Sequence, residues 1–482
     1  MKLLNYKHWS LMLVISIMAS CSQFEEMNYD PNKPTVVPTS GLLKQAQANL
    51  VYNMNGELAQ LGSQYVQHFT QLEYVEKSNY DETGISSFTG MYRSGLFDLT
   101  EIVRLNESDF SKGDVLKYGD NNNQIAVANI LKAWVFHNMT DIWGEIPYSE
   151  ALRGREDIIT PKYDTQEQIY DDLITQLENA IDLITISPEV PLQGDLIFNG
   201  NMTKWKAFAA SLRLRIAMRL SEVDDTKANA LINDADFANA FSTSSDYAHF
   251  THFLTQDESN PIYYDNIIRG GGDYHVPSNT MLDYMILLND PRISTYVNVA
   301  VNTGTYVGLE VGIPANSEDD ISLINDNYGG QEAPSILMTG AEVLFIKAEA
   351  AQRGYIGGDA ATFYNDAITA SMEYNGVDAA DIATYLAEPE VAYDVANWQE
   401  KIGAQKWLAL YAQGVQAWAE WRRLDYPVLT PGVNAIAISS GIPRRRAYTS
   451  DEYSTNSVNV TEAVERSLGG KDLFTGSVWW DK

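Results

Sequence analysis

The chain has 482 residues with a single cysteine, and 45% of its residues are hydrophobic. Its 64 Asp and Glu residues outnumber 33 Lys and Arg residues, which gives a formal net charge of −31. A chain this acidic repels phosphate backbones and anionic headgroups. We therefore expect neither nucleic-acid binding nor polybasic membrane docking. A single cysteine also excludes an internal disulfide.

The first twenty residues have the pattern of a secretory signal peptide. Lys2 and Lys7 precede the apolar run WSLMLVISIMA at residues 9–19, which is about half the length that a membrane-spanning helix needs. Two small residues then lead to the cysteine, Cys21. This arrangement resembles the lipobox of bacterial lipoproteins, in which the cysteine is acylated and becomes the new N-terminus. We therefore predict a lipoprotein signal peptide at residues 1–20 and lipidation of Cys21.

Residues 21–40 are predicted to form a lipidated tether. The stretch SQFEE after Cys21 resembles the acidic export signal that directs lipoproteins of Bacteroidetes-type bacteria to the outer face of the outer membrane. Three prolines between residues 31 and 38 favour an extended chain. We expect the lipid to hold the protein on the outer membrane, facing the cell exterior, with one folded domain at residues 41–482.

Most of this folded domain is predicted to be helical. Thr165 and Gln168 form a capping-box pair before a helix. Residues 341–376 contain two helical stretches around a glycine-rich turn, a span of about 34 residues that is typical of tetratricopeptide repeats. A less regular pair covers residues 124–184. Apolar residues recur at spacings of three and four in the segments 124–143, 165–184 and 203–221. The sequence thus predicts a mostly α fold, a tetratricopeptide-like helical-repeat scaffold with long inserted loops, which is typical of proteins that bind other molecules.

Several motifs occur in an order that resembles one known family. They are DIWGEIPYSEAL (residues 141–152), YDTQEQIYDDLITQLENAI, KWKAFAASLRLRIAMRLS, NDPRI (289–293), TGAEVLFIKAEAAQRG, GVQAWAEWRRLDYP (414–427), IPRRRAYTSDEYSTN and VWWDK. From Cys21 to Lys482 the chain is similar to nutrient-binding outer-membrane lipoproteins of the SusD/RagB type, in their SusD-like branch.

This resemblance has implications for fold, partner and activity. It implies a helical protein built on four tetratricopeptide units, with a second, looser, loop-rich region that carries the ligand site. It implies a partner, a SusC-type TonB-dependent outer-membrane channel that the protein covers as a lid. It also implies capture of oligosaccharides, or of peptides in some members, with no covalent chemistry.

Two tyrosine-rich loops are the candidate ligand site, because sugars present apolar ring faces and hydroxyl edges to aromatic and polar side chains on loops. The first loop, residues 70–95, offers Tyr74, Tyr80 and Tyr92. The second loop, residues 260–279, surrounds three glycines and is the stronger candidate. It offers Tyr263, Tyr264, Asp265, Asn266, Arg269, Asp273, Tyr274 and His275. The alternative for about half of these tyrosines is a packing role.

Other conspicuous side chains are predicted to be structural. Trp143 is expected to pack a turn, and Arg422 to pair with a carboxylate or stack on a ring. The basic run at residues 444–446 is expected to be paired internally, and Trp479 and Trp480 to hold the C-terminus.

No catalytic constellation is visible in the sequence. His249 and His252 are three residues apart without a third metal ligand, and there is neither a G-x-S-x-G motif nor a phosphate-binding loop. A carboxylate pair for glycoside hydrolysis is a property of the fold that the sequence leaves open. We expect no enzyme, no metal and no cofactor. Two alternatives to oligosaccharide capture are peptide capture and a lipid-anchored tetratricopeptide-like adaptor that binds another protein.

Overall fold

A computed structural model of the protein describes residues 36–81, 87–255, 258–269, 275–436 and 441–482. The predicted signal peptide, Cys21 and most of the predicted tether lie outside the described residues. From Thr39 to Lys482 the described chain forms one compact unit. None of the described helices combines the length and the apolarity that a bilayer crossing requires.

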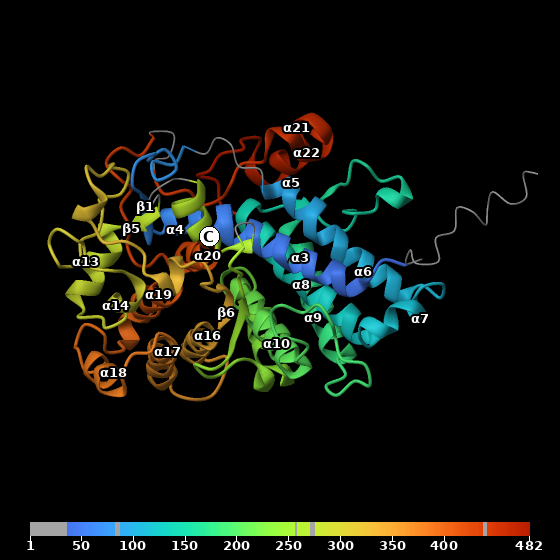
Figure 1. The fold of residues 1–482 in the computed structure, drawn as a ribbon, viewed down its shortest axis with the longest axis horizontal. Coiled ribbons are helices and arrows are strands. Elements are labelled where there is room, and N and C mark those ends of the chain that lie inside the picture. The colour runs from blue at the N-terminus through green and yellow to red at the C-terminus, as the bar shows by residue number, and fades with distance from the viewer. Residues whose placement is uncertain (1–35, 82–86, 256–257, 270–274, 437–440) are drawn as a thin grey trace, which may run out of the picture. The chain divides into compact units, whose positions relative to one another are not determined.

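Helices that follow one another in the chain pack as pairs. The pairs are α8 (Asn121–Trp143) with α9 (Gln166–Leu183), α10 (Met202–Arg219) with α11 (Asp225–Ile232), α16 (Gly340–Gln352) with α17 (Ala360–Tyr374), and α19 (Trp398–Ala409) with α20 (Gly414–Leu424). Successive pairs also contact each other through α8 and α10 and through α10 and α16 (Figure 1). The mostly helical, tetratricopeptide-like scaffold predicted from the sequence is confirmed.

The predicted pair at residues 341–376 corresponds to α16 and α17. Small residues on α16 let the two helices approach, and Phe345 packs edge-on against Tyr364 with ring centroids 6.3 Å apart. Ala341, Ala348 and Ile368 are buried beside them. One apolar face of α17 packs on α16, which is itself buried on nearly every side.

Side-chain caps set where the helices begin. The predicted capping box of α9 is present, with Thr165 accepting a hydrogen bond from the Gln168 backbone and Gln168 accepting one from Thr165. Helix α10 was predicted to begin at Thr203 but begins at Met202. The reason is its cap, because the Asn201 side chain accepts a hydrogen bond from the Lys204 N–H at 3.1 Å.

The remaining elements surround these pairs and form the connecting regions. The other helical segments are α3 (Thr39–Asn53), η2 (Met54–Leu58), α4 (Ala59–Tyr65), α5 (Ser87–Met91), η3 (Tyr92–Leu96), α6 (Phe97–Glu107), α7 (Lys112–Val115), η4 (Leu116–Tyr118), η5 (Gly154–Glu156), η6 (Leu220–Glu222), η7 (Ala235–Asn239), α12 (Pro261–Tyr263), η9 (Tyr264–Arg269), α13 (Asn279–Leu287), α14 (Ile293–Tyr296), η10 (Glu318–Asp320), α15 (Asp326–Gly329), α18 (Ala379–Leu386), η11 (Val395–Asn397), α21 (Ser450–Thr455) and α22 (Ser457–Leu468). The strands are β1 (Phe69–Gln71), β2 (Ile146–Pro147), β3 (Tyr163–Asp164), β4 (Tyr247–Phe250), β5 (His275–Pro277) and β6 (Ser335–Thr339). They form antiparallel pairs β1–β5, β2–β3 and β4–β6.

The aromatic and basic residues predicted to be structural are buried or half-buried in this scaffold. The Trp143 indole N–H donates to the Ala447 carbonyl at 3.2 Å. The Arg422 guanidinium lies 4.0 Å from the centroid of the Trp418 ring and 4.8 Å from that of Trp480, so it stacks on two rings. Arg444 donates to Asp481 at 2.8 Å, which pairs the basic run internally.

Buried ion pairs connect the repeats. Arg423 on α20 donates to Glu349 on α16 at 2.6 Å, and Arg353 donates to the same carboxylate at 2.9 Å. The Glu349 side chain is fully buried. Although burial alone would raise the pKa of Glu349, Arg423 and then Arg353 lower it to about 2. Glu349 is therefore ionised and joins α16 to α20 in the core.

Candidate functional site

The ladder between β1 and β5 brings the two tyrosine-rich loops together. Gln71 stands opposite His275, and Phe69 stands opposite Pro277. In Figure 1 the two strands lie side by side next to α4 and α13. Because β1 begins the first loop and β5 ends the second, side chains from both loops share one surface.

A small apolar core of its own supports this surface. Leu72, Val276, Leu309 and Ile321 form a cluster separate from the main core. The Ala315 N–H donates to the Leu72 carbonyl at 2.9 Å, which ties a third segment to the first loop. The loop-rich region is thus a separately packed part of the fold, beside the helical repeats.

In the first loop, one of the three predicted tyrosines is exposed. Tyr74 is 62% exposed, whereas Tyr80 is 3% exposed and packs against Tyr65 with ring centroids 5.8 Å apart. Burial raises the pKa of Tyr80 to about 12. The Tyr92 hydroxyl donates to the Pro147 carbonyl at 2.7 Å. Tyr80 and Tyr92 therefore hold the fold, and Tyr74 projects from it.

The second loop is partly helical, which corrects the expectation of an irregular segment. Residues 261–263 form α12, and residues 264–269 form the wide helical turn η9. Asn260 caps this helical segment, because its side chain accepts a hydrogen bond from the Ile262 N–H at 2.8 Å. The helical turn holds the two adjacent tyrosines of the predicted loop, Tyr263 and Tyr264.

The side chains of the second loop divide into a buried set and a partly exposed set. Asn266 and His275 are buried and bind each other, with Asn266 donating to the His275 carbonyl at 3.0 Å and accepting from its N–H at 2.8 Å. Tyr263, Tyr264 and Asp265 are half-buried. The remaining predicted residues are Arg269, which is exposed, and Asp273 and Tyr274, which lie outside the described residues.

Charged residues from both loops meet at Asp265. The Arg269 guanidinium lies 3.6 Å from the Asp265 carboxylate. Burial raises the pKa of Asp265, and the positive charges of Arg269 and of Lys77 in the first loop oppose this rise. The carboxylate is therefore a partly desolvated acceptor that a hydroxyl group of a ligand can approach.

A cleft of about 800 Å³ opens beside Tyr264. Tyr264 packs edge-on against Tyr52 of α3, with ring centroids 6.2 Å apart and an interplanar angle of 80°. Tyr52 and Phe253 are 44% and 41% exposed. The lining also includes Lys44, Gln45, Asn49, Phe250, His252 and Glu258. Exposed rings beside amide and charged groups suit a ligand with apolar faces and hydroxyl edges.

The residues of α3 that line this cleft were not predicted from the sequence. Gln45, Asn49 and Tyr52 recur at spacings of four and three, so they share one helix face. An exposed tyrosine on that otherwise polar face was the available signal. Since its partner ring is more than 200 residues away, only the fold places Tyr52 beside Tyr264.

The described residues offer this site no metal centre. No three His, Cys, Asp or Glu side chains of the described chain are grouped as metal ligands. His252, which lines the cleft, shares a hydrogen bond with the Ser335 hydroxyl at 2.8 Å, and burial lowers its pKa to about 4. The ring is therefore neutral at physiological pH.

Comparisons with known proteins give one consistent result. Residues 31–449 match the model of the SusD-like family, described as starch-binding and associating with the outer membrane. A chitin-binding protein of known structure is 28% identical, with a TM-score of 0.80, over 92% of this chain and 100% of its own. A SusD homologue from Bacteroides uniformis is 26% identical, with a TM-score of 0.76, over 92% and 99%. A chitin-binding SusD homologue from Flavobacterium johnsoniae shares the fold at 24% identity, with a TM-score of 0.73, over 91% and 98%. No curated protein matches the chain.

Proposed function

The chain belongs to the SusD-like family of starch-binding, outer-membrane-associated proteins, and we propose that it is a surface lipoprotein that captures oligosaccharides and passes them to a SusC-type TonB-dependent channel. Proteins of this family bind their ligands without catalysis. The family resemblance seen in the sequence is confirmed, and so is the prediction of a non-enzymatic protein.

The cleft beside Tyr264 is the observation that carries this proposal. Tyr264, Tyr52 and Phe253 place three rings around one cavity, and sugar rings stack their C–H faces on such surfaces. Lys44 and Gln45 are exposed at the same cavity and supply hydrogen-bond donors. A neutral oligosaccharide needs this combination of stacking and donors.

The predicted ligand residues keep different roles in the proposal. Of the predicted residues, Tyr264 lines the cleft. Tyr74, Tyr263, Asp265 and Arg269 do not line it but are at least partly exposed, so they are proposed to contact a longer ligand where it extends beyond the cleft. Asp273 and Tyr274 belong to the same proposed set. The buried or hydrogen-bonded members Tyr80, Tyr92, Asn266 and His275 are proposed to support the site from beneath.

Calorimetric titration of the full chain tests the ligand class. Maltooligosaccharides, chito-oligosaccharides and a peptide digest form the panel, and the chitin-binding relative at 28% identity makes chito-oligosaccharides the first choice. Saturable heat with a sugar supports the proposal. Heat with peptides alone would change the cargo to peptide, and heat with neither would favour the adaptor.

Membrane attachment and channel pairing have their own test. Cys21→Ser removes the sulfur that the lipid would modify, so the variant should leave the outer-membrane fraction. Affinity purification of the wild-type protein from solubilised outer membranes should also recover a large TonB-dependent channel. Retention of the variant in the membrane, or recovery without a channel, would contradict these parts of the proposal.

A further inference from the structure

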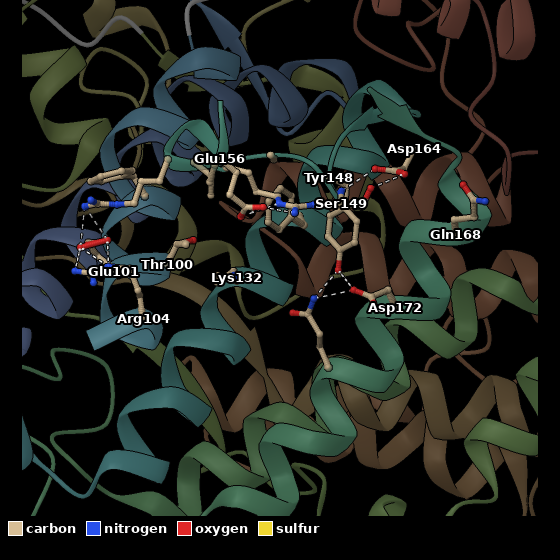
Figure 2. A pocket seen from close by; sticks show the side chains of 17 residues that line it. Thr100, Glu101, Arg104, Lys132, Tyr148, Ser149, Glu156, Asp164, Gln168 and Asp172 are labelled. Carbon is tan, nitrogen blue, oxygen red and sulfur yellow. Dashed lines mark hydrogen bonds and ion pairs between the residues drawn. The ribbon is translucent and has the colours of Figure 1, made fainter. Parts of the chain in front are cut away.

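A second cleft, of about 620 Å³, opens between α6, α8, α9 and residues 148–156. Figure 2 shows the side chains that line it. None of them also lines the cleft beside Tyr264. The cleft contains the YSEAL part of the family motif, to which the proposed function gives no role.

One wall of the second cleft is aromatic. Tyr148 packs edge-on against Phe136 with ring centroids 4.9 Å apart. Hydrogen bonds hold this ring in place, because its hydroxyl donates to Asp172 at 2.5 Å and accepts from Gln176 at 2.7 Å. Phe97, on α6, is 44% exposed and adds a second apolar surface. The cleft therefore offers fixed rings against which a flat apolar face can stack.

The other end of the cleft has more positive than negative groups. Glu101 accepts a hydrogen bond from Arg104 at 2.7 Å and lies 3.3 Å from Arg155. One carboxylate is thus shared by two guanidinium groups. The Arg155 side chain is 67% exposed, which leaves several of its N–H donors directed to solvent. This end of the cleft has a positive charge in a chain whose net charge is −31.

Lys132 adds a cation that has no ion-pair partner in the part of the chain that the structure describes. Figure 2 shows it between the Glu101–Arg104 pair and the Tyr148–Asp172 pair. Among the described residues, no carboxylate oxygen lies within 4.0 Å of its ammonium group, and it makes no hydrogen bond. Burial lowers the pKa of Lys132, and the more distant charges of Glu107 and Asp172 oppose this shift. A partly desolvated ammonium group without an ion-pair partner among the described residues gains from a ligand that carries an anion.

We propose that the second cleft binds an acidic sugar residue, a hexuronate, whose carboxylate contacts Lys132 and Arg155 and whose ring stacks on Phe97 and Tyr148. The carboxylates at the far end suit the sugar hydroxyls. Asp172 is already held by Tyr148, and Asp164 accepts from the Ser149 N–H at 2.7 Å, so each keeps lone pairs for a hydroxyl donor. This inference goes beyond the proposed function, because it needs neither the Tyr264 cleft nor a channel.

Titration of the full chain with digalacturonate, and with its dimethyl ester as the uncharged match, tests this proposal. The acid should bind at least about tenfold more tightly than the ester, since a charge-assisted hydrogen bond is lost with the charge. Lys132→Met should lower the affinity for the acid by a similar factor and leave the affinity for the ester unchanged. Lys117→Met, at an exposed lysine outside the cleft, should change neither. Equal affinities for acid and ester, or no binding of the acid, would overturn the proposal.

Further arms separate the site from its alternatives. Phe97→Ala changes an exposed side chain, so it repeats the test if Lys132→Met fails to fold; it should weaken both disaccharides about tenfold. Acetate at equal concentration should not displace digalacturonate. Displacement would mean that the cleft binds any small anion and would overturn the proposal. Tyr264→Ala should leave digalacturonate binding unchanged. Its loss in that variant would place the acid in the other cleft and overturn the proposal.

Discussion

Tyr264 packs edge-on against Tyr52, with ring centroids 6.2 Å apart. This contact joins the second tyrosine-rich loop to α3 and forms the aromatic corner of the larger cleft. Burial raises the pKa of the Tyr52 phenol, and the neighbouring Asp265 raises it further. Tyr52 therefore stays protonated and can donate a hydrogen bond at physiological pH.

The aromatic corner should carry much of the affinity for oligosaccharides. Tyr264→Ala and Tyr52→Ala should each weaken the bound sugar about tenfold, since each removes part of the roughly 1.5–3 kcal/mol that burial of an aromatic ring contributes. Both rings are partly exposed, so the melting temperature should change little. Calorimetry and thermal unfolding measure the two effects. Phe110→Ala, at a ring that is 86% exposed outside the cleft, is the control and should change neither.

The buried carboxylate of Glu349 should be essential for stability. Glu349→Gln removes the charge that Arg423 and Arg353 share in the core. The buried Arg423 guanidinium is then left with Glu420 alone, a carboxylate that Arg219 and Lys406 already share. A loss of about 3–5 kcal/mol in the free energy of unfolding is expected. Asp109→Asn, in the exposed pair with Lys112, should have no measurable effect. Urea denaturation compares the two, and equal stability of both variants would contradict this role.

Stability should fall in mild acid because the histidines are buried and neutral. Burial lowers the pKa of His137, His249 and His252 to about 4 and that of His68 and His275 to about 3. Below the unfolded pKa of about 6.5, the unfolded chain binds protons that the folded chain does not. Each histidine therefore lowers the free energy of unfolding by up to about 1.4 kcal/mol per pH unit, from pH 6.5 down to its folded pKa.

Denaturation at pH 7, 6 and 5 measures this slope, and one variant isolates a single histidine. His68 packs against the Trp407 ring, 5.0 Å between centroids, so His68→Phe keeps the packing and removes the proton. The free energy of unfolding of this variant should depend less steeply on pH, by the contribution of one histidine proton. Glu349 does not contribute to the pH dependence in this range. Its pKa is lowered to about 2, so its stabilising contribution is lost only between about pH 4.5 and 2. A flat profile from pH 7 to 5 would contradict the buried, neutral histidines.

Two glycines let α4 and α20 cross in close contact. A Cβ atom on Gly414 would lie 1.8 Å from the Ala59 carbonyl oxygen, and one on Gly62 would lie 2.4 Å from the Gly414 carbonyl oxygen. Gly414→Ala should therefore destabilise the protein by at least about 1–3 kcal/mol. Gly113→Ala, on the exposed face of α7 with open space around it, should be neutral or slightly stabilising. Thermal unfolding of the two variants checks this contrast.

The helical framework was predictable because its signals are local. The capping box at Thr165 and the apolar stripes of α9 and α16 lie within short windows, where period and cap agree. The start of α10 was missed by one residue, since Asn201 and Thr203 are both capable caps and only the backbone decides between them.

The ligand site was predictable only in part, because long-range contacts build it. The sequence proposed Tyr264, Asp265 and Arg269 as ligand contacts, and the fold leaves these side chains at least partly exposed. The sequence could not separate them from Tyr80 and His275, which have the same polar and aromatic character and are buried. The β1–β5 ladder makes that division. It pairs residues about 200 positions apart, and strands of three residues carry little periodicity of their own.

The most direct test of the central claim is a crystal structure of the protein with the oligosaccharide that binds most tightly in the titrations. We predict electron density for a sugar ring against Tyr264, within the cleft that Tyr52 and Phe253 line. Saturating sugar bound elsewhere on the protein, with this cleft empty, would contradict the assignment of the capture site.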